Sequence, residues 1–118
     1  MSTSKTLQGL YSLDHNIKLY IPGTDHVSEK FDNSEYVKRA QILFSDKFGG
    51  ATSYDAVGAW KSEKIGLVLE GVKIVESYGT RDQVEAGLPA VLEYAQYIKS
   101  ELHQEAVSLE YDNKLYFI

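Results

Sequence analysis

The sequence of 118 residues predicts an α+β fold, in which two helices pack on one face of a sheet of short strands. Three observations predict it. Two segments place apolar residues at helical spacing, the segments around them alternate or are rich in Val, Ile and Leu, and the length suits a single core. No repeat or linker divides the chain, so we expect residues 1–15 to form an N-terminal arm and residues 16–118 a single domain.

The first half predicts a strand, a loop and a helix. Residues 16–21 alternate between apolar and polar side chains, which is typical of a half-buried strand, and Pro22 and Gly23 end it. Residues 24–32 are expected to form a loop. A helix follows, and Gly49 ends it because glycine adopts the left-handed conformation without a clash. Its predicted buried stripe is Val37, Ala40, Phe44 and Phe48.

The second half predicts two strands, a second helix and two more strands. Residues 52–60 and 67–78 read as strands joined by a polar connection. Residues 80–83 have the form of a capping box, which opens a helix to about residue 102. Residues 104–111 and 114–118 read as a final hairpin. The predicted buried stripe of the second helix is Val84, Leu88, Val91, Ala95, Ile98 and Leu102.

This order of elements predicts a ferredoxin-like βαββαβ two-layer sandwich with an extra C-terminal strand. Short motifs along the chain point the same way. They are Lys18-Leu19-Tyr20, Phe48-Gly49-Gly50-Ala51-Thr52, Gly58-Ala59-Trp60 and Glu70. They resemble those of a bacterial family of unknown function, whose members read K-L-Y-F-G, F-P-x-G-x-T, G-x-W and a later glutamate. The resemblance implies a ferredoxin-like fold and an origin in a phage or plasmid, and it implies no activity.

Composition excludes several classes of function. The chain has no cysteine, which rules out disulfides, thiolate metal sites and a cysteine nucleophile. No apolar run approaches the roughly 18 residues of a membrane span, and the polar N-terminus is not a signal peptide, so we expect a cytoplasmic protein. With a net charge of −5 and no basic cluster larger than Lys38-Arg39, nucleic acid is an unfavourable partner.

Tyrosine is the compositional oddity, with nine copies beside a single tryptophan. Tyr20, Tyr54, Trp60 and Tyr78 fall on or beside predicted strands, where they would line the face that the helices leave uncovered. Such a face suits a homodimer interface or a cup for a planar ligand, and simple core filling is a third reading.

Glutamates and histidines give weaker indications of chemistry. Glu70 and Glu76 share one face of a strand, where a carboxylate could act as an acid or base, pair with Lys18 or Lys61, or lie at a solvated edge. The histidines are not spaced as metal ligands, and no nucleophile motif occurs. We therefore predict no catalytic residue, no metal site and no cofactor.

These observations favour a noncatalytic, homo-oligomeric binding protein over an enzyme. One form of the hypothesis is a counter-defence factor of a phage or other mobile element, which sequesters a nucleotide signal or inhibits a host defence protein. The alternative is a small dimeric α+β-barrel-type enzyme that acts on a small polar substrate through Glu70 or a tyrosine. A third reading is an acidic protein that occupies a nucleic-acid-binding surface.

The predicted ligand-binding residues are Lys18, Tyr20, Tyr54, Trp60 and Glu70. Trp60 and Tyr20 are expected to stack on a planar, anionic, nucleotide-like ligand, and Lys18 or Lys61 to meet its charge.

Overall fold

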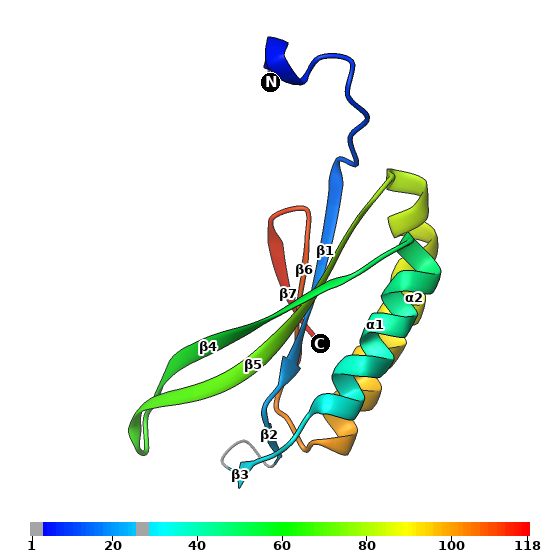
Figure 1. Ribbon diagram of the computed structural model, residues 1–118. Helices are drawn as coiled ribbons and strands as arrows, with labels where there is room; N and C mark the ends of the chain where they lie inside the picture. The colour runs from blue at the N-terminus through cyan, green and yellow to red at the C-terminus, as the bar shows by residue number, and fades with distance from the viewer. Residues whose placement is uncertain (1–3, 26–28) are drawn as a thin grey trace.

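The computed structural model describes residues 4–25 and 29–118 and is shown in Figure 1. Its short first element is the 3-10 helix η1 (Lys5–Leu7). The remaining elements in chain order are β1 (His15–Pro22), β2 (Thr24–Asp25), β3 (Glu29–Lys30), α1 (Ser34–Phe48), β4 (Thr52–Ser62), β5 (Gly66–Gly79), α2 (Arg81–Glu101), β6 (Ser108–Tyr111) and β7 (Lys114–Phe117). No helix among these described residues is long and apolar enough to cross a membrane.

The chain folds into two layers, with α1 and α2 side by side on one face of a five-stranded antiparallel sheet (Figure 1). The strand order is β4-β5-β1-β6-β7, and β2 and β3 form a separate two-stranded ribbon. The predicted α+β class and two-layer arrangement are therefore confirmed.

The finer ferredoxin-like prediction needs correction. The predicted extra C-terminal strand is present as β7, which pairs with β6 at the edge of the main sheet, but the resulting five-stranded order is not the classic ferredoxin-like one. The predicted loop at residues 24–32 contains the ribbon of β2 and β3, and its residues 26–28 lie outside the described residues. Strands of two residues are too short to show a period in the sequence, which is why this ribbon escaped prediction.

The core lies between the helices and the sheet, as the sequence patterns predicted. Ile17, Leu19 and Ile21 are fully buried on the helix side of β1. All but one member of the predicted stripe of α2 are buried, and Leu88 is partly buried against the same cluster. The alternation of β1 and the helical spacing of α2 therefore identified the two apolar surfaces that meet.

The ends of the helices also follow the sequence. The Thr80 hydroxyl accepts a hydrogen bond from the Gln83 backbone, and the Gln83 side chain accepts one from the Thr80 backbone, which confirms the capping box of α2. Gly49 ends α1 with a φ of 89°. Pro89 lies inside α2 without ending it, and Gly87 lets the Phe48 ring of α1 approach so closely that a Cβ would lie 2.7 Å from it.

Residues 4–14 precede the sheet and extend away from it (Figure 1). They contain only the turn of η1, in which no residue is buried. The division into an arm of residues 1–15 and a domain of residues 16–118 stays a prediction, and residues 1–3 lie outside the described residues.

The hairpin of β4 and β5 projects beyond the helices, as Figure 1 shows, and we call residues 56–69 the projecting arm. On the side of the sheet that bears the helices, this arm carries Val57, Leu67 and Leu69, which are 74, 68 and 65% exposed. Large apolar side chains gathered on an uncovered surface are typical of interaction sites rather than of monomers.

We expect the protein to assemble into a homodimer or a larger homo-oligomer, because burying this arm against another copy would remove its apolar side chains from water. Sedimentation equilibrium at micromolar concentration is expected to give a mass at least twice the 13.3 kDa of the chain. Replacing Leu69 with lysine should shift that mass towards the monomer, whereas the same change at the exposed helix residue Ile42 should not. A 13.3 kDa species of the unmodified protein throughout this range would contradict the prediction.

Candidate functional site

The helices leave one face of the main sheet uncovered, which we call the open face. The strand registers place side chains two residues apart on the same face, so Lys18 and Tyr20 of β1 lie opposite the buried isoleucines and leucine of that strand. Glu70 of β5 and the aromatic residues of β4 share this face by their register with β1. The open face thus carries all the predicted site residues, Lys18, Tyr20, Tyr54, Trp60 and Glu70.

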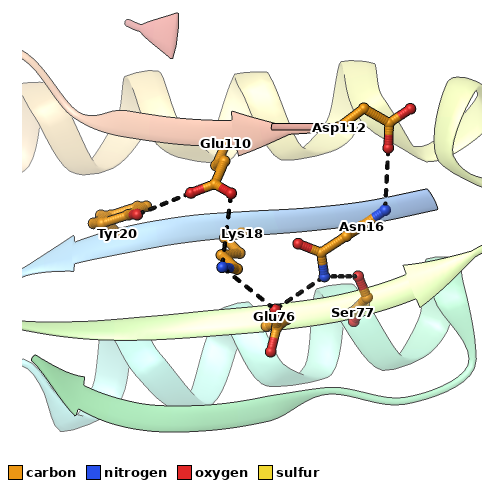
Figure 2. Close-up of polar contacts among 7 residues, drawn as sticks. All are labelled: Asn16, Lys18, Tyr20, Glu76, Ser77, Glu110 and Asp112. Atoms are coloured by element: carbon orange, nitrogen blue, oxygen red, sulfur yellow. Dashed lines mark hydrogen bonds and ion pairs between the residues drawn. The ribbon is translucent and has the colours of Figure 1, made fainter. Parts of the chain in front are cut away.

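A polar network occupies the centre of the open face (Figure 2). The Lys18 ammonium lies 3.7 Å from Glu76 Oε2 of β5 and 3.6 Å from Glu110 Oε2 of β6. Asn16 Nδ2 donates to the same Glu76 oxygen at 3.0 Å, and the Tyr20 hydroxyl donates to Glu110 Oε1 at 3.1 Å. The network therefore joins three adjacent strands and fixes the side chain of Lys18 between two carboxylates.

This network keeps Lys18 and Tyr20 in their ordinary charge states at neutral pH. Burial by itself lowers the pKa of Lys18, but the carboxylates of Glu110 and Glu76 raise it, and the net shift is upward. Burial and the bond to Glu110 raise the pKa of Tyr20. Lys18 is consequently a charged ammonium whose charge is already balanced by protein groups, and Tyr20 is a neutral phenol.

A groove of about 570 Å³ crosses the open face between the projecting arm and the C-terminal hairpin of β6 and β7. Tyr20, Trp60 and Glu70 line it, together with Leu115 and Phe117 of β7. Its volume is in the range of sites for small ligands, which are mostly apolar with a few polar groups. The groove brings together Tyr20, Trp60 and Glu70, whereas Lys18 and Tyr54 lie on the same face outside its lining.

Glu70 is the carboxylate that the sheet contributes to the groove. Its Oε1 accepts a hydrogen bond from the Thr24 hydroxyl at 2.8 Å, and no cationic side chain among residues 4–25 and 29–118 forms a salt bridge with it. Of the readings left open for Glu70 and Glu76, pairing with Lys18 is confirmed for Glu76. Glu70 does not pair with Lys18, which lies between Glu76 and Glu110, nor with Lys61, which lies on the other side of its strand from Trp60.

Among the described strand residues whose side chains lie on the open face, Glu70, Glu76 and Glu110 are carboxylates and Lys18 is the one ammonium. A surface with excess negative charge attracts cations and disfavours anions. Aromatic rings such as Trp60, which is 42% exposed, attract cations in addition. The arrangement consequently suits a planar ligand that carries positive charge better than the anionic nucleotide that the sequence suggested.

Sequence reasoning missed Thr24 and Glu110. Thr24 lies in the segment predicted as a loop, and Glu110 lies 92 residues from Lys18 in a strand whose register the sequence does not reveal. The alternation of residues 107–111 could have placed Glu110 on the face opposite Leu109, but only the pairing of β1 with β6 brings it beside Lys18.

The two histidines within the described ranges, His15 and His103, each lie beside an aspartate. His15 Nδ1 lies 2.7 Å from Asp112 Oδ2, and His103 Nδ1 lies 3.0 Å from Asp25 Oδ1. Across the described ranges no group of three or more histidine or acidic side chains is placed to hold a metal ion.

Comparison of this chain with known proteins finds structural similarity only. No family model and no curated protein sequence matches the chain, so the family suggested by the motifs is not confirmed. A phage SAM lyase in complex with S-methyl-5'-thioadenosine is similar, with a TM-score of 0.65 and 13% identity over 92% of this chain and 94% of that chain. A phage SAM lyase in the apo state gives 0.62 and 12% over 94% and 93%. The chain therefore has the fold of these phage proteins.

Proposed function

We propose that the chain is a small enzyme that binds S-adenosylmethionine (SAM) in the groove of the open face and cleaves it with release of S-methyl-5'-thioadenosine. The observation that carries the proposal is Glu70, a carboxylate without a cationic partner among the described residues, in an aromatic groove of suitable size. The shared fold with a phage SAM lyase supports the choice of substrate. This favours the enzymatic alternative over the noncatalytic reading of the sequence.

The substrate fits the charges of the site. SAM is a sulfonium with an adenine ring, so an aromatic side chain can stack on the ring while carboxylates attract the positive sulfur. Trp60 and Tyr20 are assigned to stacking, and Glu70 to the methionyl end. Lys18 and Tyr54 lie at the border of the site, where Lys18 holds Glu76 and Glu110 in place.

The proposed reaction breaks the bond between the sulfur and the γ-carbon of the methionyl chain. The electron pair of that bond goes to the sulfur, which becomes a neutral thioether. The remaining four-carbon unit can close to homoserine lactone when its own carboxylate attacks the γ-carbon. It can instead leave as vinylglycine when a protein carboxylate removes a proton from the β-carbon. In the first case Glu70 holds the substrate ammonium, and in the second it takes the proton.

Consumption of SAM would deprive host methyltransferases of their methyl donor. If a phage or plasmid encodes the chain, this loss of SAM would act against a host defence that depends on SAM. Cleavage of SAM is then the chemical mechanism of the counter-defence hypothesis. In this proposal the protein cleaves a nucleoside sulfonium, SAM, instead of sequestering a nucleotide signal.

The test combines binding and product analysis. SAM is expected to quench the fluorescence of Trp60, the only tryptophan of the chain, and to raise the unfolding temperature. Added salt should weaken the binding of SAM more than the binding of the neutral thioether S-methyl-5'-thioadenosine, because only SAM carries the positive sulfur. AMP serves as the anionic control and should bind least.

Chromatography should then show S-methyl-5'-thioadenosine accumulating as SAM disappears, and mass spectrometry of the four-carbon product assigns the role of Glu70. Saturable binding without turnover would restore the noncatalytic reading. Neither binding nor turnover with SAM would show that the proposed function is wrong.

A further inference from the structure

Thr24 begins β2, two residues after the end of β1, and its side chain contacts Glu70 of the groove. Its side chain is buried, with 7% exposed, and its hydroxyl donates to Glu70 Oε1 at 2.8 Å. A buried hydroxyl that meets a carboxylate forms one of the stronger kinds of hydrogen bond, because the acceptor is charged. Within the described part of the chain, Thr24 is thus the side chain in direct polar contact with the Glu70 carboxylate.

Backbone contacts on both sides hold Thr24 in this place. Gly23 lies so close to β5 that a Cβ would be 2.3 Å from the backbone oxygen of Gly71. The backbone oxygen of Gly23 also accepts a hydrogen bond from Phe31 at 3.1 Å. On the other side, Gln104 Nε2 donates to the backbone oxygen of Thr24 at 2.9 Å. The close approach at Gly23 and the bond from Gln104 fix the position from which the hydroxyl reaches Glu70.

Glu70 needs such a partner more than the other glutamates of the open face. Glu76 and Glu110 are each oriented by Lys18 and by a second donor, Asn16 or Tyr20. The Thr24 hydroxyl is the donor that orients Glu70 within the described ranges of the chain. Glutamate has several rotatable bonds, and without that donor its carboxylate would sample several rotamers in the groove.

We infer that Thr24 is a positioning residue, whose hydroxyl fixes the Glu70 carboxylate in the orientation that meets the substrate. The inference rests on the proposed function for its effect on catalysis. With Oε1 held by Thr24, Oε2 is the oxygen left to contact the methionyl end of SAM. Preorganised groups act on a substrate without first being reordered, which is the advantage of this arrangement.

Three variants test the inference. Thr24→Val keeps the size and β-branching but removes the donor, and it is expected to lower kcat/KM for SAM on the order of tenfold. Thr24→Ser restores a hydroxyl and should recover most of that loss. Thr52→Val makes the same change at an exposed strand position outside the groove and should leave kcat/KM unchanged. Thermal unfolding of all three shows whether a loss of activity merely reflects a loss of folded protein.

Crystal structures of the unmodified protein, Thr24→Val and Thr24→Ser give a readout that needs no substrate. The Glu70 carboxylate should keep one conformer wherever a hydroxyl is present at residue 24 and should change or divide between conformers in Thr24→Val. The same single conformer in Thr24→Val, or full activity of that variant, would overturn the inference. Failure of the unmodified protein to act on SAM would instead contradict the proposed function, and the conformers of Glu70 would still decide the role of Thr24.

Discussion

Ile98→Ala is expected to lower the free energy of unfolding by about 2–5 kcal/mol, the range for removing a large aliphatic side chain from a core. Ile98 is fully buried in α2 and belongs to the cluster that joins both helices to the sheet. Alanine favours the helix, so the loss would come from burial and from the cavity rather than from the backbone. Urea unfolding followed by circular dichroism measures the change.

Ile42→Ala is the matched control, because Ile42 is an isoleucine in the other helix and is 54% exposed. The same chemical change there should stay within about 0.5 kcal/mol. A loss below about 0.5 kcal/mol at Ile98 as well would mean that the apolar stripe of α2 does not face the sheet.

The parts of the fold that local patterns specify were predictable. The stripe of α2 follows from steps of three and four residues, and its start follows from the capping box of Thr80 and Gln83. Gly49 marks the end of α1 because the last turn needs a left-handed residue there. Each of these features depends on residues close together in the sequence, so no knowledge of the tertiary fold was required.

The features that depend on distant pairings were not predictable. Strands β4 and β5 are both longer than predicted, because their pairing with each other keeps them extended beyond the helices. The predicted strand at residues 104–111 begins only at Ser108, and Gln104 instead turns its amide towards Thr24. These outcomes depend on which distant segment each strand or side chain contacts, and the sequence pattern does not predict those contacts.

The candidate site shows the same division. Period-two alternation placed Lys18 beside Tyr20 on one face of its strand and Glu70 beside Glu76 on one face of theirs, and the registers of β1, β4 and β5 bring both pairs to the same face of the sheet. The expected role of Lys18 depends on what lies beside it, and the neighbouring strands supply two carboxylates. A single strand therefore predicts which side chains share a face, whereas the charge of that face follows only from the order of the strands.

Glu70→Gln is expected to lower kcat for SAM cleavage by about 10²-fold or more, the contribution of a positioned acid, base or ion-pairing group. Glutamine keeps the shape of the side chain and can still accept the bond from Thr24, so only the negative charge is removed. A neutral amide can neither take a proton from the substrate nor form an ion pair with its ammonium. Initial rates of S-methyl-5'-thioadenosine release measure the effect.

Glu105→Gln distinguishes this role from a general effect of charge. Glu105 also lines the groove, but its side chain is exposed, so water and salt screen its charge. The same loss of one negative charge should therefore change kcat less than about threefold. An equal loss in both variants would mean that the groove acts only through its overall potential, and a Glu70→Gln variant of undiminished rate would remove Glu70 from the reaction. A selective loss at Glu70 requires contact with the reacting end of the substrate, because the two carboxylates otherwise contribute the same charge to the same groove.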